Sequence, residues 1–314
     1  MILTLTPVPS LDRTATTGEQ LGPDMVCQLG DISTVPGGVG VNVTHTLYRA
    51  GRDTLAVFPA PEISHYMRLM AVTGTPHQFV AVPGPIQMHF TLTDPAGATT
   101  VLKDPPMPLD PTQLAMLRDL AVTLAETASW VLLAGPLPNI ATAAWYVEVI
   151  RALTLYHPKV RIAVATEGDA LHALVRQLAV THPHVLVVTQ ADLASVTGRN
   201  LQEVDDAALL AAADELVASG VPEVLVACSR SHAVLVNESE AWSATTPAPG
   251  GRQGIHWRES LLAGYLMAAE DDAPPAQRLA SALAYAHAQG SQWDNFLPTP
   301  DLVQHDVVEC TQLR

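Results

Sequence analysis

Lysine is scarce in this chain, and its scarcity argues against two classes of partner. The 314 residues contain two lysines, Lys103 and Lys159, and the formal net charge is -15. Nucleic acids and anionic membrane surfaces are bound mainly by basic side chains, so we expect neither as a partner. The same shortage leaves few cations with which a polyanionic ligand could be held.

Clustered cysteines and long hydrophobic runs are also missing. The three cysteines, Cys27, Cys228 and Cys310, lie far apart without a Cys-x-x-Cys pair, so we expect no disulfide framework, no zinc site and no other protein-held metal. No stretch approaches 18 uninterrupted apolar residues, and the first ten residues lack the pattern of a secretory leader. These features predict a cytoplasmic protein that does not span a membrane.

What the sequence does contain is an alternation of apolar strands and helices. This alternation predicts an α/β fold with a doubly wound, mostly parallel sheet that helices cover on both faces. The predicted core strands are residues 2–6, 54–58, 130–134, 161–166, 185–188 and 223–227. The predicted helices are residues 41–49, 113–126, 141–155, 169–180, 207–219, 259–270 and 275–289. A hairpin at 233–237 and 240–243 is expected at the edge of the sheet.

Two polar, turn-rich segments interrupt this pattern in the first third of the chain. Residues 10–35 contain a possible strand at 25–29, and residues 86–102 contain two short strands with a turn at 94–97. We expect these segments to form a small β lid on a single domain that comprises residues 1–314. Because ligands of such sheets bind at the carboxyl ends of the strands, the site is expected in the loops that follow them.

One of these loops is a glycine-rich turn that leads into a helix. Gly250, Gly251 and Gly254 precede Glu259, near the start of the predicted helix. Unpaired N–H groups at a helix start attract anions, so Glu259 could be a general base beside a bound phosphate. The alternative is that Glu259 only favours the first turn of a buried helix.

Six motifs, in order along nearly the whole chain, give it a family resemblance. They are TPVPSLDRT (6–14), PGGVGVN (36–42), DTLAVFPA (53–60), WVLLAGPLP (130–138), DLASVTGR (192–199) and SLLAGYL (260–266). The chain resembles the PfkB branch of the ribokinase-like carbohydrate kinases, and most of all 1-phosphofructokinase and tagatose-6-phosphate kinase. The resemblance implies a ribokinase-like fold, a homodimer formed through the lid, and transfer of the γ-phosphoryl group of ATP, with Mg²⁺, to a sugar hydroxyl.

The catalytic residues that the resemblance implies are altered in this sequence. The family pattern Gly-Ala-Gly-Asp falls on His256, Trp257, Arg258 and Glu259. Glu259 keeps the carboxylate of the base but moves it by about 1.5 Å, and a misplacement of ~1 Å can cost ~10²-fold in rate. Trp257 and Arg258 bring side chains into the space where backbone N–H groups would close around phosphate, although Arg258 could supply positive charge there.

At the positions that the resemblance assigns to the substrate, polar and glycine residues are kept but the basic residues are not. The residues carried over to sugar binding are Asp12, Gly37, Gly38, Asn42 and Lys103. Three family residues that would contact a substrate phosphate fall on Val39, Gln87 and Pro136, none of which can carry positive charge. Lys103 could partly replace them, or it could be a solvated lid lysine, and Asp12 could equally be a turn cap.

The nucleotide side is altered as well. The residues carried over to nucleotide binding are Thr189, Asp192, Ser229 and Gly254. Asp192 could act on water bound to Mg²⁺, although helix capping explains it equally well. The glycines of the family's nucleotide turn are absent from residues 228–232, and Glu167 adds a carboxylate near the path of the phosphates, which it would repel.

These changes support three hypotheses. The first is a binding or regulatory pseudokinase that has lost or greatly reduced phosphoryl transfer, so that ATP and Mg²⁺ are expected as cofactors only under the kinase hypothesis. The alternative is an active ATP- and Mg²⁺-dependent kinase that uses Glu259 as base and Arg258 as cation and acts on an uncharged polyol or nucleoside-like alcohol. The third is a different chemistry at His256, Arg258 and Glu259.

Three further features are weaker. His182 and His184 could suggest a metal pair but have no third ligand nearby in sequence. Cys228 with His232 lacks an orienting third group for a thiol nucleophile. The acidic run at residues 270–272 is most simply a solvated helix end.

Overall fold

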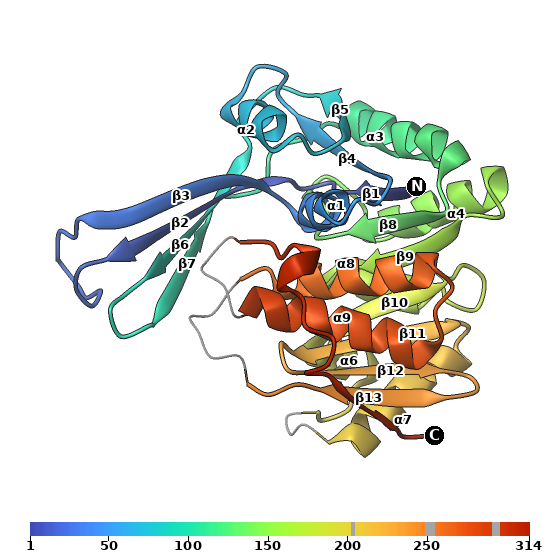
Figure 1. Ribbon diagram of the computed structural model, residues 1–314. Coiled ribbons are helices and arrows are strands. Elements are labelled where there is room, and N and C mark those ends of the chain that lie inside the picture. The colour runs from blue at the N-terminus through green and yellow to red at the C-terminus, as the bar shows by residue number, and fades with distance from the viewer. Residues whose placement is uncertain (202–204, 249–254, 291–295) are drawn as a thin grey trace.

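The main sheet of the protein is doubly wound and mostly parallel. The computed structural model describes residues 1–201, 205–248, 255–290 and 296–314, and within them this sheet has ten strands in the order β14-β13-β12-β11-β10-β9-β8-β1-β4-β5 (Figure 1). Their bounds are β1 (Ile2–Leu5), β4 (Thr54–Ala60), β5 (His77–Ala81), β8 (Trp130–Ala134), β9 (Arg161–Ala165), β10 (Val185–Thr189), β11 (Glu223–Ser229), β12 (His232–Asn237), β13 (Ala241–Thr245) and β14 (Glu309–Gln312). The strands from β11 to β5 are parallel, and β12, β13 and β14 add antiparallel pairs. The predicted fold class is confirmed.

The position of β1 in this sheet determines where a ligand can bind. β1 pairs in parallel with β4 on one side and with β8 on the other. The chain first extends the sheet through β4 to β5 and then returns past β1 to continue from β8. Connections therefore leave the carboxyl ends of β1 and β8 in opposite directions, and they open a crevice at this point.

Helices cover both faces of the sheet. On one face a hydrophobic cluster includes residues of α1 (Val39–Arg49), α8 (Trp257–Glu270) and α9 (Pro275–Gly290). The cluster on the other face includes residues of α2 (His65–Thr73), α3 (Pro111–Leu124), α4 (Trp145–Tyr156), α5 (Gly168–Val175), α6 (Gln190–Thr197) and α7 (Asp206–Ala218). Short 3₁₀ helices occur at η1 (Ala125–Thr127) and η2 (Pro300–Leu302). No helix in the described part of the chain is long and apolar enough to cross a membrane.

The helices α2 and α6 and the strands β2 (Ser10–Thr17), β3 (Leu29–Gly37) and β14 were not predicted from the sequence, and two predicted helices are shorter. α2 and α6 are short, and each starts at a side-chain cap, Ser64 for α2 and Thr189 with Asp192 for α6. β14 pairs with β13, so the predicted hairpin β12–β13 does not form the edge of the sheet. The helix predicted at 169–180 ends at Val175, and the one predicted at 141–155 starts at Trp145.

The lid is a separate four-stranded sheet. Its strands, in the order β3-β2-β6-β7, are β3 (Leu29–Gly37), β2 (Ser10–Thr17), β6 (Gln87–Thr93) and β7 (Thr99–Lys103), and they project away from the body of the protein (Figure 1). The strand expected at 25–29 is wrong. Residues 25–28 belong to the connection between β2 and β3, where Val26 is 95 % exposed and has no neighbouring strand to pair with among the described residues, and Leu29 is the first residue of β3.

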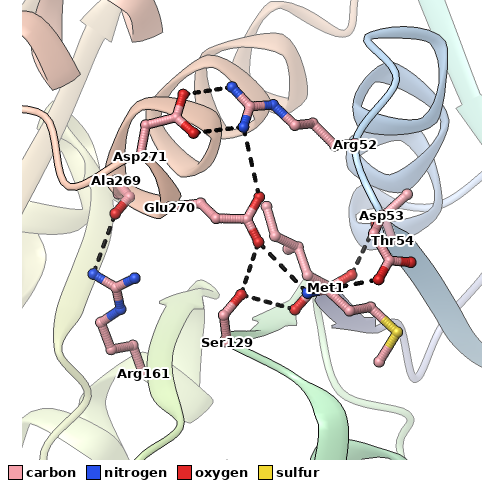
Figure 2. Close-up of polar contacts among 10 residues, drawn as sticks. Met1, Arg52, Asp53, Thr54, Ser129, Arg161, Ala269, Glu270 and Asp271 are labelled. Atoms are coloured by element: carbon pink, nitrogen blue, oxygen red, sulfur yellow. Dashed lines mark hydrogen bonds and ion pairs between the residues drawn. The ribbon is translucent and has the colours of Figure 1, made fainter.

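Helix α8 is fixed at its carboxyl end by a polar network (Figure 2). Glu270 Oε1 accepts a hydrogen bond from Ser129 Oγ at 2.8 Å and lies 3.6 Å from the amino group of Met1. Arg52 donates two hydrogen bonds to the carboxylate of Asp271, at 2.6 and 2.5 Å. Arg161 donates to the carbonyl oxygen of Ala269 and to Asp272. The expectation of a solvated acidic helix end is confirmed for Asp271 and Asp272, whose side chains are 54 and 79 % exposed, but not for Glu270, which is 19 % exposed. Each of the three carboxylates has a basic partner that also complements the negative end of the helix dipole.

Candidate active site

A single cleft joins the lid to the carboxyl end of the main sheet. Its volume is about 470 Å³, and its walls come from the lid strands, the loops after β8, β9 and β10, and the start of α8. The predicted site residues that line it are Asp12, Gly38, Asn42, Lys103, Thr189, Asp192, Arg258 and Glu259. Gly37 lies directly behind Asp12, Ser229 is not among the lining residues, and Gly254 falls outside the described residues.

Glu259 is the third residue of α8 and points into this cleft. Its side chain is 13 % exposed, and Oε1 lies 3.6 Å from Nδ1 of His256. Among the residues that the structure describes, Oε2 is buried and has no hydrogen-bond partner. Oε2 is therefore an acceptor that a hydroxyl group could complete.

His256 lies between Glu259 and Asp12, which the sequence did not predict. Its ring is 5 % exposed; Nε2 lies 3.4 Å from Oδ2 of Asp12, and Nδ1 lies 3.2 Å from Nδ2 of Asn42. Strand β2, helix α1 and the cap of α8 thus meet at one imidazole. The signal in the sequence was the departure from glycine at position 256, but the direction of the new side chain could not be derived from it.

Asp12 is held by the protein on both of its carboxylate oxygens. Ser10 Oγ donates to Oδ1 at 2.7 Å, and Nδ1 of His89 lies 3.4 Å from the same oxygen. Burial favours the neutral acid, but the hydrogen bond from His89 and the charges of His256 and His89 outweigh it and lower the pKa of Asp12 below its ordinary value. Asp12 is therefore an anion inside the wall of the cleft, and its binding to a sugar stays a prediction.

The lysine and the arginine that line the cleft come from different elements. Arg258 is exposed at the start of α8, and Lys103 is exposed at the end of β7. Neither predicted role, phosphoryl stabilisation for Arg258 or substrate binding for Lys103, is tested by the geometry. Both side chains line the same cleft as Glu259, so either could reach an anionic group bound there.

Thr189 and Asp192, which are predicted to bind nucleotide, lie at the end of the cleft formed by the loops after β9 and β10. Thr189 Oγ1 donates to Oδ2 of Asp192 at 2.6 Å and accepts from its backbone N–H, which forms the cap of α6. Glu167 lines this end too. The capping interpretation of Asp192 is confirmed, while nucleotide binding by Thr189 and Asp192 stays a prediction.

A magnesium ion would fit this end of the cleft only as a companion of phosphate. No group of three or more metal-ligating side chains occurs in the part of the chain that the structure describes. Mg²⁺ on a nucleotide keeps several waters and needs only one or two carboxylates. Asp192 and Glu167 supply that number, so the donor set suits a nucleotide-bound ion rather than one held by the protein alone.

Comparison with known proteins identifies the family. The sequence profile of the pfkB family carbohydrate kinases matches residues 9–250, well over half of the chain. The chain belongs to the PfkB family. Curated relatives include 1-phosphofructokinase of Rhodobacter capsulatus, 29 % identical over 270 residues that cover 84 % of this chain and 83 % of the relative. Another is ATP-dependent 6-phosphofructokinase isozyme 2 of Escherichia coli, 26 % identical over 251 residues that cover 79 % of this chain and 78 % of the relative.

Solved structures of PfkB phosphofructokinases share the fold. The structure of phosphofructokinase-2 from Escherichia coli in complex with potassium has a TM-score of 0.86 with 23 % identity, and 96 % of each chain is covered. A possible 1-phosphofructokinase from Thermotoga maritima has a TM-score of 0.86 with 16 % identity over the full length of both chains. The predicted family and ribokinase-like fold are confirmed. The family match ends at residue 250, so it does not include Glu259.

Within this PfkB fold, the wall expected to hold a substrate phosphate is neutral. Val39, Gln87 and Pro136 all line the cleft. Val39 packs toward Gly135, and a Cβ on that glycine would lie 3.5 Å from Val39 Cγ2. Gln87 Nε2 lies 3.2 Å from Nε2 of His89, so the side-chain amide of Gln87 already has a hydrogen-bond partner within the lid. These three residues therefore supply no positive charge, and the basic side chains that line the lid wall near them are His89, which contacts Gln87, and Lys103, which pairs with His89 across β6 and β7.

The weaker sequence features do not form further catalytic sites. Burial, with the charge of Asp206, raises the pKa of Cys228 to about 12, so this thiol is not a nucleophile at neutral pH. His232 Nε2 instead lies 2.8 Å from Oδ1 of Asp206. His184 accepts a hydrogen bond from the backbone N–H of Ile162 through Nδ1, at 3.0 Å, which ties that nitrogen to β9 rather than leaving it for a metal.

Proposed function

We propose that this PfkB protein is an active ATP-dependent carbohydrate kinase in which Glu259 is the general base. The observation that carries the proposal is the carboxylate of Glu259, a residue that lines the cleft and whose buried Oε2 has no hydrogen-bond partner among the described residues. A buried acceptor left open costs free energy unless a ligand completes it. A base in a kinase needs this arrangement, because the hydroxyl it activates must approach within about 3 Å.

In the proposed reaction, the acceptor hydroxyl lies between Glu259 and the γ-phosphorus of ATP. Its oxygen forms a bond to that phosphorus while the bond from phosphorus to the β,γ-bridging oxygen breaks, and ADP leaves with the electron pair. The hydroxyl proton passes to Oε2 of Glu259. Arg258 supplies positive charge near the transferring group. Mg²⁺, when bound with the nucleotide, neutralises phosphate charge, and Asp192 and Glu167 would hold it.

The acceptor that suits this cleft carries hydroxyl groups and no phosphate. Val39, Gln87 and Pro136 supply no charge where a substrate phosphate would need it. A dianion placed against a neutral wall, in a protein with a net charge of -15, would be bound weakly. A free sugar, a polyol or a nucleoside fits better, because it needs hydrogen-bond partners only.

Glu259→Gln tests the proposal. We expect kcat to fall by about 10²- to 10⁴-fold, with the dissociation constant for ATP within twofold of the original, in an assay of ADP release with free hexoses, pentitols and nucleosides as acceptors. Glu238→Gln, at an exposed turn, is the matched control and should leave kcat unchanged. If Glu259→Gln left turnover intact, Glu259 would not be the base.

A second candidate function is a binding or regulatory pseudokinase. It is favoured by the protein side chains that already contact the carboxylate of Asp12. Ser10, His89 and His256 surround the carboxylate that a sugar would need. This hypothesis predicts no Mg²⁺-dependent ATP consumption with fructose 1-phosphate, fructose 6-phosphate, tagatose 6-phosphate or any uncharged acceptor. Ordinary ATP affinity in calorimetry, together with turnover on any acceptor, would exclude it.

We also infer that residues 1–314 act as one domain and that two copies associate through the lid. All five residues of β7 are exposed, and Ile32, Val101 and Leu102 present apolar side chains on the lid. One related structure is described as the tetrameric inhibited form of phosphofructokinase-2 from Escherichia coli. Leu102→Glu should shift the sedimentation coefficient to that of a monomer, and Val180→Glu, an exposed apolar position outside the lid, should not. A cytoplasmic location stays a prediction.

A further inference from the structure

Four side chains from three elements, helix α8 with its cap, β2 and β6, form a continuous polar line along the cleft. Glu259 Oε1 lies 3.6 Å from His256 Nδ1, His256 Nε2 lies 3.4 Å from Asp12 Oδ2, and Asp12 Oδ1 lies 3.4 Å from His89 Nδ1. The line starts on α8, passes through its cap, crosses β2 and ends on β6. Carboxylates and imidazoles alternate along it, so each ring lies beside at least one carboxylate.

The two nitrogens of His256 are used by different neighbours. Nε2 faces a carboxylate that cannot donate, so the favourable state has a proton on Nε2 that points to Asp12. Nδ1 faces both Glu259 Oε1, at 3.6 Å, and the side-chain amide of Asn42, at 3.2 Å. When Nδ1 is also protonated, the ring donates toward both carboxylates, and Asn42 can turn its amide oxygen toward the ring.

We propose that His256 is a positioning residue, oriented by Asp12, which holds Oε1 of Glu259 so that Oε2 faces the acceptor hydroxyl. This inference rests on the proposed role of Glu259 as base. A glutamate has one more rotatable bond than an aspartate and would otherwise sample several positions of its carboxylate. When both ring nitrogens are protonated, attraction between Nδ1 and Oε1 removes that freedom and leaves Oε2 for the acceptor hydroxyl.

The surroundings of His256 agree with this role. Asp12 comes from β2, Asn42 from α1, and Glu259 and Arg258 from α8, and all of them line the cleft. The backbone on either side of the ring is fixed as well, because the carbonyl oxygen of His256 accepts from both the N–H and the hydroxyl of Ser260, at 3.1 and 3.0 Å. An imidazole that only filled space would not need a carboxylate near each of its two nitrogens.

Two substitutions of His256 by residues with side-chain amides distinguish the contribution of Nδ1 from that of Nε2. The side-chain nitrogen of asparagine reaches about as far as Nδ1 of histidine, and that of glutamine about as far as Nε2. We therefore expect His256→Asn to keep the contact with Glu259 and lose at most about threefold in kcat. We expect His256→Gln to lose that contact and about 10- to 100-fold in kcat. KM should change by less than twofold in both variants, because the ring orients the base rather than the substrate.

The melting temperature and kcat are measured together for both variants. If His256 had a merely structural role, kcat would fall in proportion to the loss of melting temperature, or it would fall equally in His256→Asn and His256→Gln. Either result overturns the proposal. Asp12→Asn is the companion variant. It should lower kcat by about 10-fold, because the ring of His256 loses the carboxylate that orients it, whereas His256→Asn should keep most of the original kcat.

A second measurement needs no turnover. The ring signal of His256 is followed by NMR through a pH titration of the ligand-free protein and assigned from its disappearance in His256→Asn. We expect the midpoint to fall by about one pH unit in Asp12→Asn and again in Glu259→Gln, because each substitution removes a nearby negative charge. A midpoint that either substitution leaves unchanged overturns the proposal. Absence of ATP turnover in the unaltered protein, with both midpoints shifted, would count against the proposed kinase function alone.

Discussion

The carboxylate of Asp12 packs directly against the α-carbon of Gly37, so closely that a Cβ on this glycine would overlap Oδ2 and Cγ of the aspartate. Gly37 is the last residue of β3, and its carbonyl oxygen accepts a hydrogen bond from the buried hydroxyl of Tyr66, at 3.0 Å. The backbone can therefore not move away from Asp12 without breaking that bond. Gly37 lies outside the wall of the cleft, but it determines where Asp12 can be.

Gly37→Ala is expected to displace Asp12 and its partners. The overlap cannot be relieved cheaply, because Ser10, His89 and His256 hold the carboxylate in place. We expect the free energy of unfolding in urea to fall by about 1–3 kcal/mol. Gly18→Ala, at the residue directly after lid strand β2, is the matched control, since a Cβ there would meet no atom within 4 Å, and it should change stability by less than ~0.5 kcal/mol. Equal effects of the two variants would contradict the packing argument.

Glu270 should matter more for stability than its place at the end of a helix suggests. Its carboxylate is 19 % exposed and contacts Ser129, the amino group of Met1 and Arg52 (Figure 2). We expect Glu270→Gln to lower the free energy of unfolding by about 1–2 kcal/mol, because partly buried partners lose a charged acceptor. Asp53→Asn removes a carboxylate that also lies near Met1 but is 82 % exposed, so it should cost only ~0–0.5 kcal/mol.

The stability of the protein is expected to fall between about pH 6.5 and pH 4 through His45. Burial, with the charge of Arg49, lowers the pKa of His45 to about 4 in the folded protein. Below pH 6.5 the unfolded chain binds a proton at this histidine that the folded chain does not, so acid favours unfolding. The full effect near pH 4 is roughly 2–3 kcal/mol. Above pH 6.5 His45 contributes no pH dependence.

His45→Asn tests this origin of the pH dependence. Asparagine can keep the hydrogen bond that Nδ1 of His45 makes with Thr75 Oγ1, at 2.7 Å, but it does not titrate. Unfolding measured at pH 7 and at pH 4.5 should then differ less than in the unaltered protein. His65→Asn, at an exposed position on α2, serves as the control and should leave the pH dependence as it was. An unchanged slope in His45→Asn would rule out His45 as its source.

Cys228 is expected to resist alkylation in the folded protein. Its thiol is half-buried, and burial raises its pKa to about 12, so very little thiolate exists at pH 8. Iodoacetamide at pH 8, followed by peptide mass spectrometry, should modify Cys228 at least 100-fold more slowly in native protein than in urea. Rapid native modification would revive the hypothesis of a thiol nucleophile beside His232.

Much of the fold follows from local properties of the sequence, and the missed elements show where such properties end. The apolar runs of the core strands and the long helices each carry enough periodicity to be assigned without neighbours. α6 has only eight residues, and β14 is a four-residue strand that is mostly exposed. Short elements like these depend on the strand or helix that they contact, so their own residues do not specify them.

For the candidate site, the sequence by itself determined which residue types stand at the motif positions. It placed a carboxylate at Glu259, a neutral side chain at Val39 and a histidine in place of glycine at position 256. Only the tertiary structure decided that His256 turns toward Asp12 and Glu259, and that Glu270 at the far end of α8 meets Ser129 and Arg52. The physical reason is that motif spacing fixes positions along the chain, whereas a side chain settles where packing, burial and charge from distant segments give it the lowest free energy.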